Sequence, residues 1–337
     1  MSSARTHSAA ASGALDLPGR TRGMGELVDV AGKQTQLAPF GNELAELGRQ
    51  RPEIVALTAD MGRYSDILPF RDAHPDRFFN VGMAEQNLIA MAAGLAKVGK
   101  IAYCTTYSVF VTRRAYDFVA IACAHSKANV KIFAGMPGLL NGYGATHQAT
   151  EDLNMMRGIA DLTVIDPCDA IELRQVVRAV ADLPGTVYVR LPRGKVPVEL
   201  PTDYQFEVGR ATQLRSGRQV GVVSTGYMTA RALDAARVAQ ERGVDAGVLH
   251  VSTIKPFDTA GVLDFVRRHD RVVVAENHKT TGALASLVVE AMFDAGVHKP
   301  VERIGLADSF FECGSQEYLE HKYQVDLPRL IKALAGE

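Results

Sequence analysis

The sequence predicts an α/β protein, with a doubly wound, mainly parallel sheet followed by a smaller α/β domain. From Thr35 onward, helical and strand patterns alternate, as expected where helices cover parallel strands. The chain has 337 residues, whereas single cores rarely grow past about 250–300 residues. We therefore expect two domains, residues 25–195 and 206–337, joined by a linker at residues 196–205.

The first domain begins with a predicted helix at residues 40–51. A second helix, rich in Ala and Gly, is expected at residues 88–98. Between and after them come short apolar runs bounded by turn residues, which is typical of buried parallel strands. These predicted strands are residues 54–58, 78–81, 101–105, 130–134, 162–165 and 187–191.

Three prolines, Pro192, Pro197 and Pro201, and a loss of periodicity up to Tyr204 predict the linker. Behind it, strands are expected at residues 220–224, 246–250, 271–275 and 301–306, with helices at 228–242, 259–268 and 283–294. Asp326 is expected to cap a last helix that ends near residue 334, because Pro328 suits its first turn.

Composition excludes several classes of function. The net charge is −1 and 22% of the residues are charged, so no basic surface indicates a nucleic acid or an anionic membrane as partner. The four cysteines, at positions 104, 123, 168 and 313, have neither disulfide nor metal-ligand spacing, which favours the reducing cytoplasm. Residues 1–24 lack an apolar stretch long enough for a signal peptide or membrane span, and we expect a disordered tail there.

The most informative residue is Glu85, which follows Gly82-Met83-Ala84 and precedes the helical pattern of residues 88–98. A glutamate in the first turn of a helix is favoured by the helix dipole at any surface. Taken alone, Glu85 therefore indicates no function, and its meaning depends on segments further along the chain.

Three segments in order resemble the pyrimidine-binding domain of transketolases. They are the glycine-x-x-glutamate segment at residues 79–87, the aromatic stretch at 107–116 and the Thr-His-Gln box at 146–153. Glu276-Asn277-His278 with Gly282 is similar to the acid-x-His segment of the family's C-terminal domain. The resemblance covers nearly all of residues 25–335.

This resemblance implies a thiamine diphosphate site. A carboxylate beside N1′ of the aminopyrimidine favours the imino tautomer that accepts the C2 proton, and Glu85 would carry this role. Phe110 would stack on the pyrimidine, with Arg113 and Tyr116 lining its pocket one helical turn apart. Asp60 and Met61 are similar to an Ala-Asp-Leu segment near the cofactor, although an Asp after a strand is equally common as a turn residue.

The resemblance also assigns residues to the substrate. His147 would bind the substrate oxygens near C1 and C2 and polarise the carbonyl. Arg193 occupies the place of an arginine that grips the substrate phosphate, although an Arg after a strand is more often a solvated charge. Tyr143 stands where the family has an aspartate that contacts a donor hydroxyl.

The sequence departs from the family at four polar positions, which here are Leu37, Tyr64, Gly135 and Tyr143. The following loop, residues 136–141, is also more apolar. These differences predict either a substrate unlike the usual sugar phosphates or contacts supplied by a partner.

A second departure concerns the metal. The family binds Mg²⁺ and the diphosphate through a Gly-Asp-Gly segment and a downstream Asn, and this sequence contains no Gly-Asp-Gly. We therefore expect no metal ligands on this chain. It resembles the C-terminal half of a split transketolase, whose Mg²⁺ ligands lie on a separate N-terminal-half subunit in an α2β2 assembly.

The predicted activity is transfer of a two-carbon ketol unit from a ketose to an aldehyde. A β subunit of a 2-oxoacid dehydrogenase has the same domain plan, but the Thr-His-Gln box and residues 113–116 fit transketolases better. A deoxyxylulose phosphate synthase is also similar around Glu85, but such enzymes carry both halves on one chain. The remaining alternative is a noncatalytic subunit for assembly or regulation, against which the intact Glu85 and His147 argue.

Overall fold

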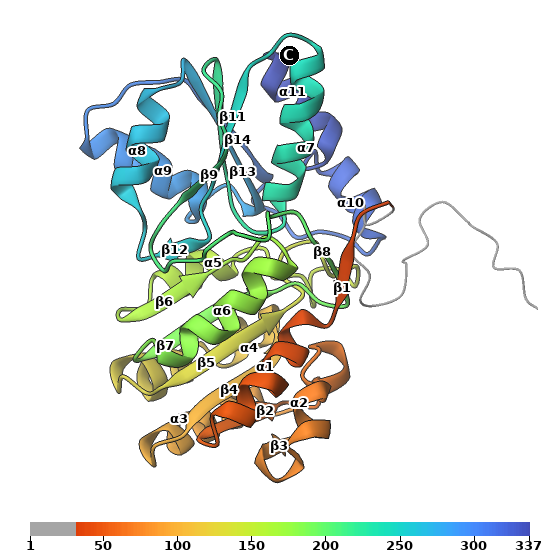
Figure 1. The fold of residues 1–337 in the computed structure, drawn as a ribbon, viewed down its shortest axis with the longest axis vertical. Helices are drawn as coiled ribbons and strands as arrows, with labels where there is room; N and C mark the ends of the chain where they lie inside the picture. Colours follow the sequence, from red (N-terminus) through yellow and green to blue (C-terminus); the bar gives the residue numbers. More distant parts are fainter. Residues whose placement is uncertain (1–31) are drawn as a thin grey trace, which may run out of the picture.

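The larger sheet has seven strands in the order β12-β6-β7-β5-β4-β2-β3, and all of its neighbours are parallel except β12 and β6 (Figure 1). The computed structural model describes residues 32–337; the predicted tail, residues 1–24, lies outside them. The strands are β2 (Ile54–Thr58), β3 (Phe78–Asn80), β4 (Ile101–Tyr107), β5 (Val130–Gly135), β6 (Leu162–Ile165), β7 (Thr186–Leu191) and β12 (Thr253–Lys255).

Helices cover both faces of this sheet because the strands are apolar on both sides. One face carries α1 (Pro39–Gln50), α2 (Leu68–Ala73) and α6 (Ala170–Asp182), whose apolar residues form one core cluster with the strands. The other face carries α3 (Glu85–Lys97), α4 (Ser108–Arg114), the π-helical segment η3 (Phe118–His125) and α5 (Asp152–Arg157). Short 3₁₀ turns follow β2 and α2, η1 (Gly62–Tyr64) and η2 (Pro75–Arg77).

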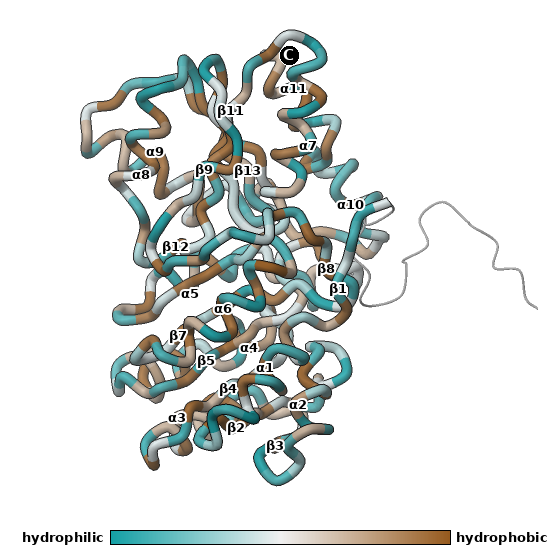
Figure 2. The backbone as a smooth tube through the Cα atoms, in the orientation of Figure 1, coloured by the Kyte–Doolittle hydropathy of each residue, from teal (hydrophilic) through white to brown (hydrophobic). Residues whose placement is uncertain are grey.

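The smaller sheet has five strands in the order β14-β13-β10-β11-β9, and β9 is its one antiparallel strand. These are β9 (Thr212–Arg215), β10 (Val220–Ser224), β11 (Ala246–His250), β13 (Arg271–Lys279) and β14 (Val301–Leu306). On one face lie α7 (Met228–Glu241), α10 (Gln316–Lys322) and α11 (Leu327–Ala335), and on the other α8 (Thr259–Arg267) and α9 (Leu284–Asp294). Hydropathy alternates along these helices, as amphipathic packing requires (Figure 2).

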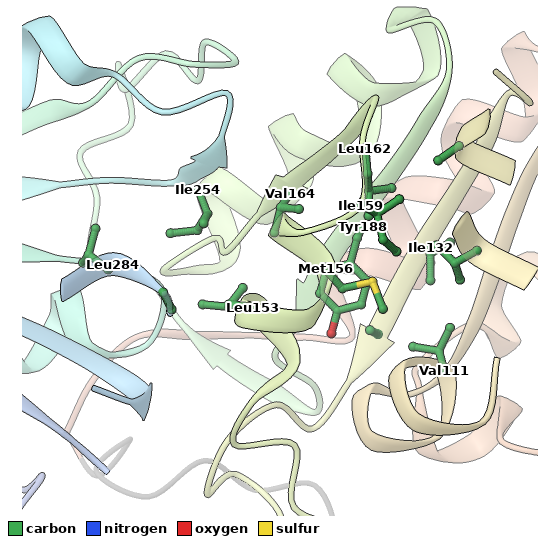
Figure 3. Packing of buried hydrophobic residues seen from close by; sticks show 14 of the residues in the cluster. Val111, Ile132, Leu153, Met156, Ile159, Leu162, Val164, Tyr188, Ile254 and Leu284 are labelled. Atoms are coloured by element: carbon green, nitrogen blue, oxygen red, sulfur yellow. The ribbon is translucent and has the colours of Figure 1, made fainter. Parts of the chain in front are cut away.

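The two sheets share one hydrophobic core. Leu153 and Met156 of α5 pack in the same cluster as Ile254 of β12 and Leu284 of α9 (Figure 3). β12 belongs by sequence to the predicted second domain but extends the first sheet. The two units are therefore joined by strand pairing as well as by side-chain packing.

The predicted fold class is confirmed, and five predicted strands agree with the observed ones residue for residue, at 54–58, 162–165, 220–224, 246–250 and 301–306. The prediction missed β1 (Thr35–Leu37) and its antiparallel partner β8 (Lys195–Pro197), as well as β9, β12 and α10. β8 occupies the start of the predicted linker. β13 runs four residues beyond its predicted end, so Glu276-Asn277-His278 is part of a strand.

Within residues 32–337, no helix is both long and apolar enough to span a lipid bilayer.

Candidate active site

A cavity of about 440 Å³ lies at the carboxyl edge of the larger sheet. Ligands bind at this edge in open parallel sheets, because the loops that leave neighbouring strands converge there. The segments that follow β2, β3, β4 and β5 in the chain supply its walls. The lining residues are Ala59, Met61, Tyr64, Met83, Glu85, Tyr107, Phe110, Arg114, Tyr143 and His147. A larger hollow of about 790 Å³, lined mainly by residues 199–214, lies away from these strand ends.

Glu85 is the buried carboxylate of this cavity, with 3% of its surface exposed. It is the first residue of α3, where the helix dipole favours a negative charge. The turn before it needs Gly82, whose φ of +76° is easy only for glycine. Asn80 fixes this turn, since its Oδ1 accepts hydrogen bonds from the backbone N–H groups of Gly82 and Asp60.

Arg114 contacts two of the predicted cofactor residues at once. Its Nη1 donates a hydrogen bond to Glu85 Oε1 over 3.0 Å, and its Cζ lies 4.1 Å from the centre of the Phe110 ring. Phe110 and Arg114 are four residues apart on α4, so both side chains project from the same face of that helix. The sequence prediction had named Arg113 for this pocket, and Arg114 lies in its place.

Aromatic rings surround His147. Its ring centre lies 5.3 Å from that of Phe110, 5.8 Å from that of Tyr143 and 6.4 Å from that of Tyr107, each in an edge-on arrangement. Nδ1 of His147 hydrogen-bonds with the Thr146 hydroxyl. Burial, and then the charge of Arg114, lowers the pKa of His147 below its usual value of 6.5. The imidazole is therefore neutral at pH 7 and keeps one N–H to donate.

Three residues predicted for the cofactor do not line the cavity. Asp60 adopts a left-handed conformation (φ +57°) and its exposed side chain pairs with Asn80. Arg113 donates to Glu151 and to the carbonyls of Ala145 and Gln148, so it braces the loop that carries His147. Tyr116 follows the end of α4 and packs partly buried against the main core cluster.

Arg193 also lies outside the lining, behind two tyrosines that belong to it. Its guanidinium carbon is 5.8 Å from the centre of the Tyr64 ring, and Arg193 also faces Tyr107. Burial raises the pKa of Tyr107 to about 12, although the positive charge of Arg193 opposes this shift. Only 8% of Arg193 is exposed; its Nε forms a long ion pair with Asp66 over 3.9 Å, and neither Nε nor Nη1 has a hydrogen-bond partner within residues 32–337. The side chains of Tyr64 and Tyr107 therefore lie between Arg193 and the cavity.

The four residues that depart from the family pattern lie at different distances from the cavity. Tyr64 and Tyr143 line the cavity, and the Cα of Gly135 lies close by, since a Cβ added there would meet the Tyr107 ring at 3.6 Å. Leu37 lies on β1, with 67% of its surface exposed. The apolar loop of residues 136–141 packs inward, because Leu139 is fully buried in the core of the smaller unit. The apolar character of Leu139 therefore serves packing.

The acid-x-His segment in β13 holds elements together away from the cavity. Glu276 accepts hydrogen bonds from the backbone N–H groups of Leu284 and Ala285 at the start of α9, and burial raises its pKa to about 7. His278 Nε2 accepts a longer bond from the backbone N–H of Asn154 in α5.

Arg190 forms a deeply buried ionic cluster. It donates to Asp152 through Nε and Nη2, and through Nη1 to Asp166 and the carbonyl of Asn277 in β13. Tyr188 adds a hydrogen bond to Asp152. Burial alone would raise the pKa of Asp152, but the charge and hydrogen bonds of Arg190, together with His278 and Tyr188, keep it low. Burial raises the pKa of Asp166 to about 6. This cluster joins the two sheets, and the sequence patterns did not identify it.

Cys168, Glu172 and His250 bring three kinds of metal ligand within 4.8 Å of one another, all buried. Hydrogen bonds within the protein already use the ligand atoms of Glu172 and His250. His250 Nε2 bonds to Glu172 over 2.8 Å, and Glu172 also accepts from the Tyr204 hydroxyl and the Cys168 backbone N–H. This arrangement accounts for the Glu172 and His250 side chains without an ion.

Comparisons with known proteins agree with the fold. The family described as "Transketolase, pyrimidine binding domain" matches residues 34–199, and "Transketolase, C-terminal domain" matches residues 209–330. A "Putative uncharacterized transketolase family protein" of Sinorhizobium fredii is 47% identical over 89% of this chain and 88% of its own length. A 6-deoxy-6-sulfo-D-fructose transketolase subunit of a Clostridium species is 37% identical, over 86% of this chain and 90% of that subunit.

A solved structure titled "Split gene transketolase, inactive beta4 tetramer" superposes with a TM-score of 0.82 at 38% identity, and covers 90% of this chain and 98% of its own. These matches span both sheets and nearly the full length of the relatives named. The chain belongs to the transketolase family, as the part that holds the pyrimidine-binding and C-terminal domains.

Proposed function

We propose that this chain is one subunit of a thiamine diphosphate-dependent transketolase, which transfers a two-carbon ketol unit from a ketose to an aldehyde together with a diphosphate-binding subunit. The observation that carries the proposal is a buried carboxylate, Glu85, opposite the ring of Phe110 in an aromatic cavity. Membership in the transketolase family and similarity to named transketolase subunits support it.

The residues present fit the cofactor's aminopyrimidine. The planar Arg114 guanidinium already hydrogen-bonds to Glu85 and lies over Phe110, and a flat ring with polar nitrogens can make the same two contacts. When bound, thiamine diphosphate supplies an electron sink for carbanion chemistry. Glu85 would share a proton at N1′, Phe110 would stack on the ring, and the neutral His147 would donate to a substrate oxygen.

The proposal places Mg²⁺ and the diphosphate on the partner subunit. Glu85 is the one carboxylate among the lining residues, and the Gly-Asp-Gly segment is absent from the sequence. Hard cations need several oxygen ligands, which this cavity does not offer.

We further propose an α2β2 assembly. The free thiols of all four cysteines support a cytoplasmic location.

The purified chain is expected to show no ketol transfer and to bind thiamine diphosphate poorly. Adding the diphosphate-binding subunit with Mg²⁺ should restore both, because each subunit would hold one end of the cofactor. Isothermal titration with thiamine diphosphate, followed by a ketol transfer assay, checks the two steps separately. Full turnover by rigorously partner-free chain would contradict the split-enzyme proposal.

Substrate preference is the second point that the cavity addresses. With Tyr64 and Tyr143 in its wall and Arg193 behind the tyrosines, this chain presents few donors to a terminal phosphate. We propose a donor or acceptor that lacks the usual terminal phosphate or bears a different group there. The positive charge of Arg193, whose Nη1 has no hydrogen-bond partner among the described residues, still favours an anionic end.

For two ketoses that differ only in the terminal phosphate, we expect kcat/KM to be higher for the one without the phosphate. Remote contacts that are missing cannot position the substrate for the transition state, so kcat/KM falls and not KM alone. Kinetics of the wild-type complex and of Arg193→Ala measure this. A strong wild-type preference for xylulose 5-phosphate or fructose 6-phosphate would show that the partner supplies the phosphate contacts.

A further inference from the structure

Arg114 occupies the part of the cavity that Glu85 and Phe110 define. One of its nitrogens is 3.0 Å from the Glu85 carboxylate, and its guanidinium carbon stands 4.1 Å from the centre of the Phe110 ring. A group bound there by stacking on Phe110 and hydrogen bonding to Glu85 would use these same two surfaces. Arg114 and such a group therefore exclude each other.

Because Glu85 is buried, its contact with Arg114 stabilises the free chain. The Glu85 side chain is only 4% exposed, whereas that of Arg114 is 51% exposed. An ionised carboxylate with little access to water is costly unless a charge or hydrogen bond compensates it. Arg114 supplies that compensation, and a guanidinium over an aromatic face adds a cation–π attraction.

Exposure also makes Arg114 easy to displace. Its side chain starts at the last residue of α4 and reaches the cavity from the solvent side. Among the residues described, Glu85 is the one carboxylate with which it forms an ion pair. Moving it out breaks one hydrogen bond and one ring contact and leaves the backbone unchanged.

We propose that Arg114 is a placeholder for the aminopyrimidine: it neutralises Glu85 and covers Phe110 in the free subunit, and the cofactor must displace it to bind. This inference rests on the proposed function. Cofactor affinity is then reduced by the stability of the closed Arg114 arrangement, because only the fraction with Arg114 displaced is competent to bind. A site of this kind stays folded and protected before the cofactor arrives.

The test uses Arg114→Met in the complex with the diphosphate-binding subunit and Mg²⁺. Methionine keeps the length and apolar contact of the side chain but removes the charge and the donors. We expect thiamine diphosphate to bind at least ~5-fold more tightly by isothermal titration, in the usual range for coupled binding sites. The isolated Arg114→Met chain should melt at a lower temperature than the wild type, because Glu85 loses its partner.

Arg174→Met is the matched control. Arg174 on α6 is also half-exposed and also pairs with a buried glutamate, Glu43 of α1, which Arg178 contacts as well. Both helices cover the face of the larger sheet opposite to α4. Arg174→Met should alter the melting temperature without changing cofactor affinity. If Arg114→Met does not fold, Arg114→Lys keeps the charge beside Glu85 but loses the planar group over Phe110, and should give a smaller gain in affinity.

Weaker cofactor binding by the Arg114 variants would show that Arg114 holds the cofactor, and unchanged affinity would show that the pair has no such role. Either result would refute the proposal that Arg114 is a placeholder for the aminopyrimidine. Failure of the wild-type complex to bind thiamine diphosphate at all would instead refute the proposed function.

Discussion

Glu85→Gln is expected to slow exchange of the C2 proton of bound thiamine diphosphate by at least ~10²-fold, the low end for a positioned acid–base group. An amide has nearly the shape of the carboxylate but cannot share a proton with N1′. The chain should still fold and assemble, since Glu85 contributes no hydrogen bond to the helix start. Hydrogen–deuterium exchange at C2 in the reconstituted complex is the measurement.

The control for this variant is Glu43→Gln, which changes a glutamate of similar burial on the opposite face of the sheet. It should leave the exchange rate unchanged. A wild-type rate in the Glu85→Gln complex, with cofactor shown to be bound, would remove Glu85 from the mechanism.

Arg190→Met is expected to lower the free energy of unfolding by about 3–5 kcal/mol, the usual cost of leaving a buried charge without its partner. Asp152 is fully buried and receives two hydrogen bonds from Arg190, and Asp166 depends on the same guanidinium. Denaturant unfolding of the isolated chain at pH 7, followed by circular dichroism, measures the change.

Arg210→Met removes an ion pair with Glu207 that is exposed on both sides, and serves as the comparison. Water screens a pair that is exposed on both sides, so such a pair contributes little to stability, and this variant should unfold close to the wild type. Equal effects of the two substitutions would contradict the structural role assigned to Arg190.

The sequence predicted long elements well and short ones poorly. Strands such as β10 and β11 are continuous apolar runs, and buried parallel strands have that pattern. β1, β8 and β12 have three residues each and mixed polarity, so their pairing depends on contacts with distant segments. No local pattern can encode such contacts.

The same limit applies to the site. The resemblance located Glu85, Phe110 and His147, and the structure brings all three to one cavity, but their chemical roles stay predictions. The resemblance assigns Arg113 to the pocket, whereas the structure turns Arg114 toward Glu85. Both arginines are within about a turn of Phe110, and the sequence does not show which of them faces Glu85. The presence of an Arg four residues after Phe110 was the available signal.

The pairing of β12 with β6 has a practical consequence for dividing the chain. A fragment that ends at residue 205 would lose β12, and β6 would become an uncovered edge with free backbone N–H and C=O groups. Ile254 would also leave the cluster that contains Leu153. Such a fragment should associate edge to edge and precipitate, because the first sheet needs a strand from beyond the linker to cover its edge.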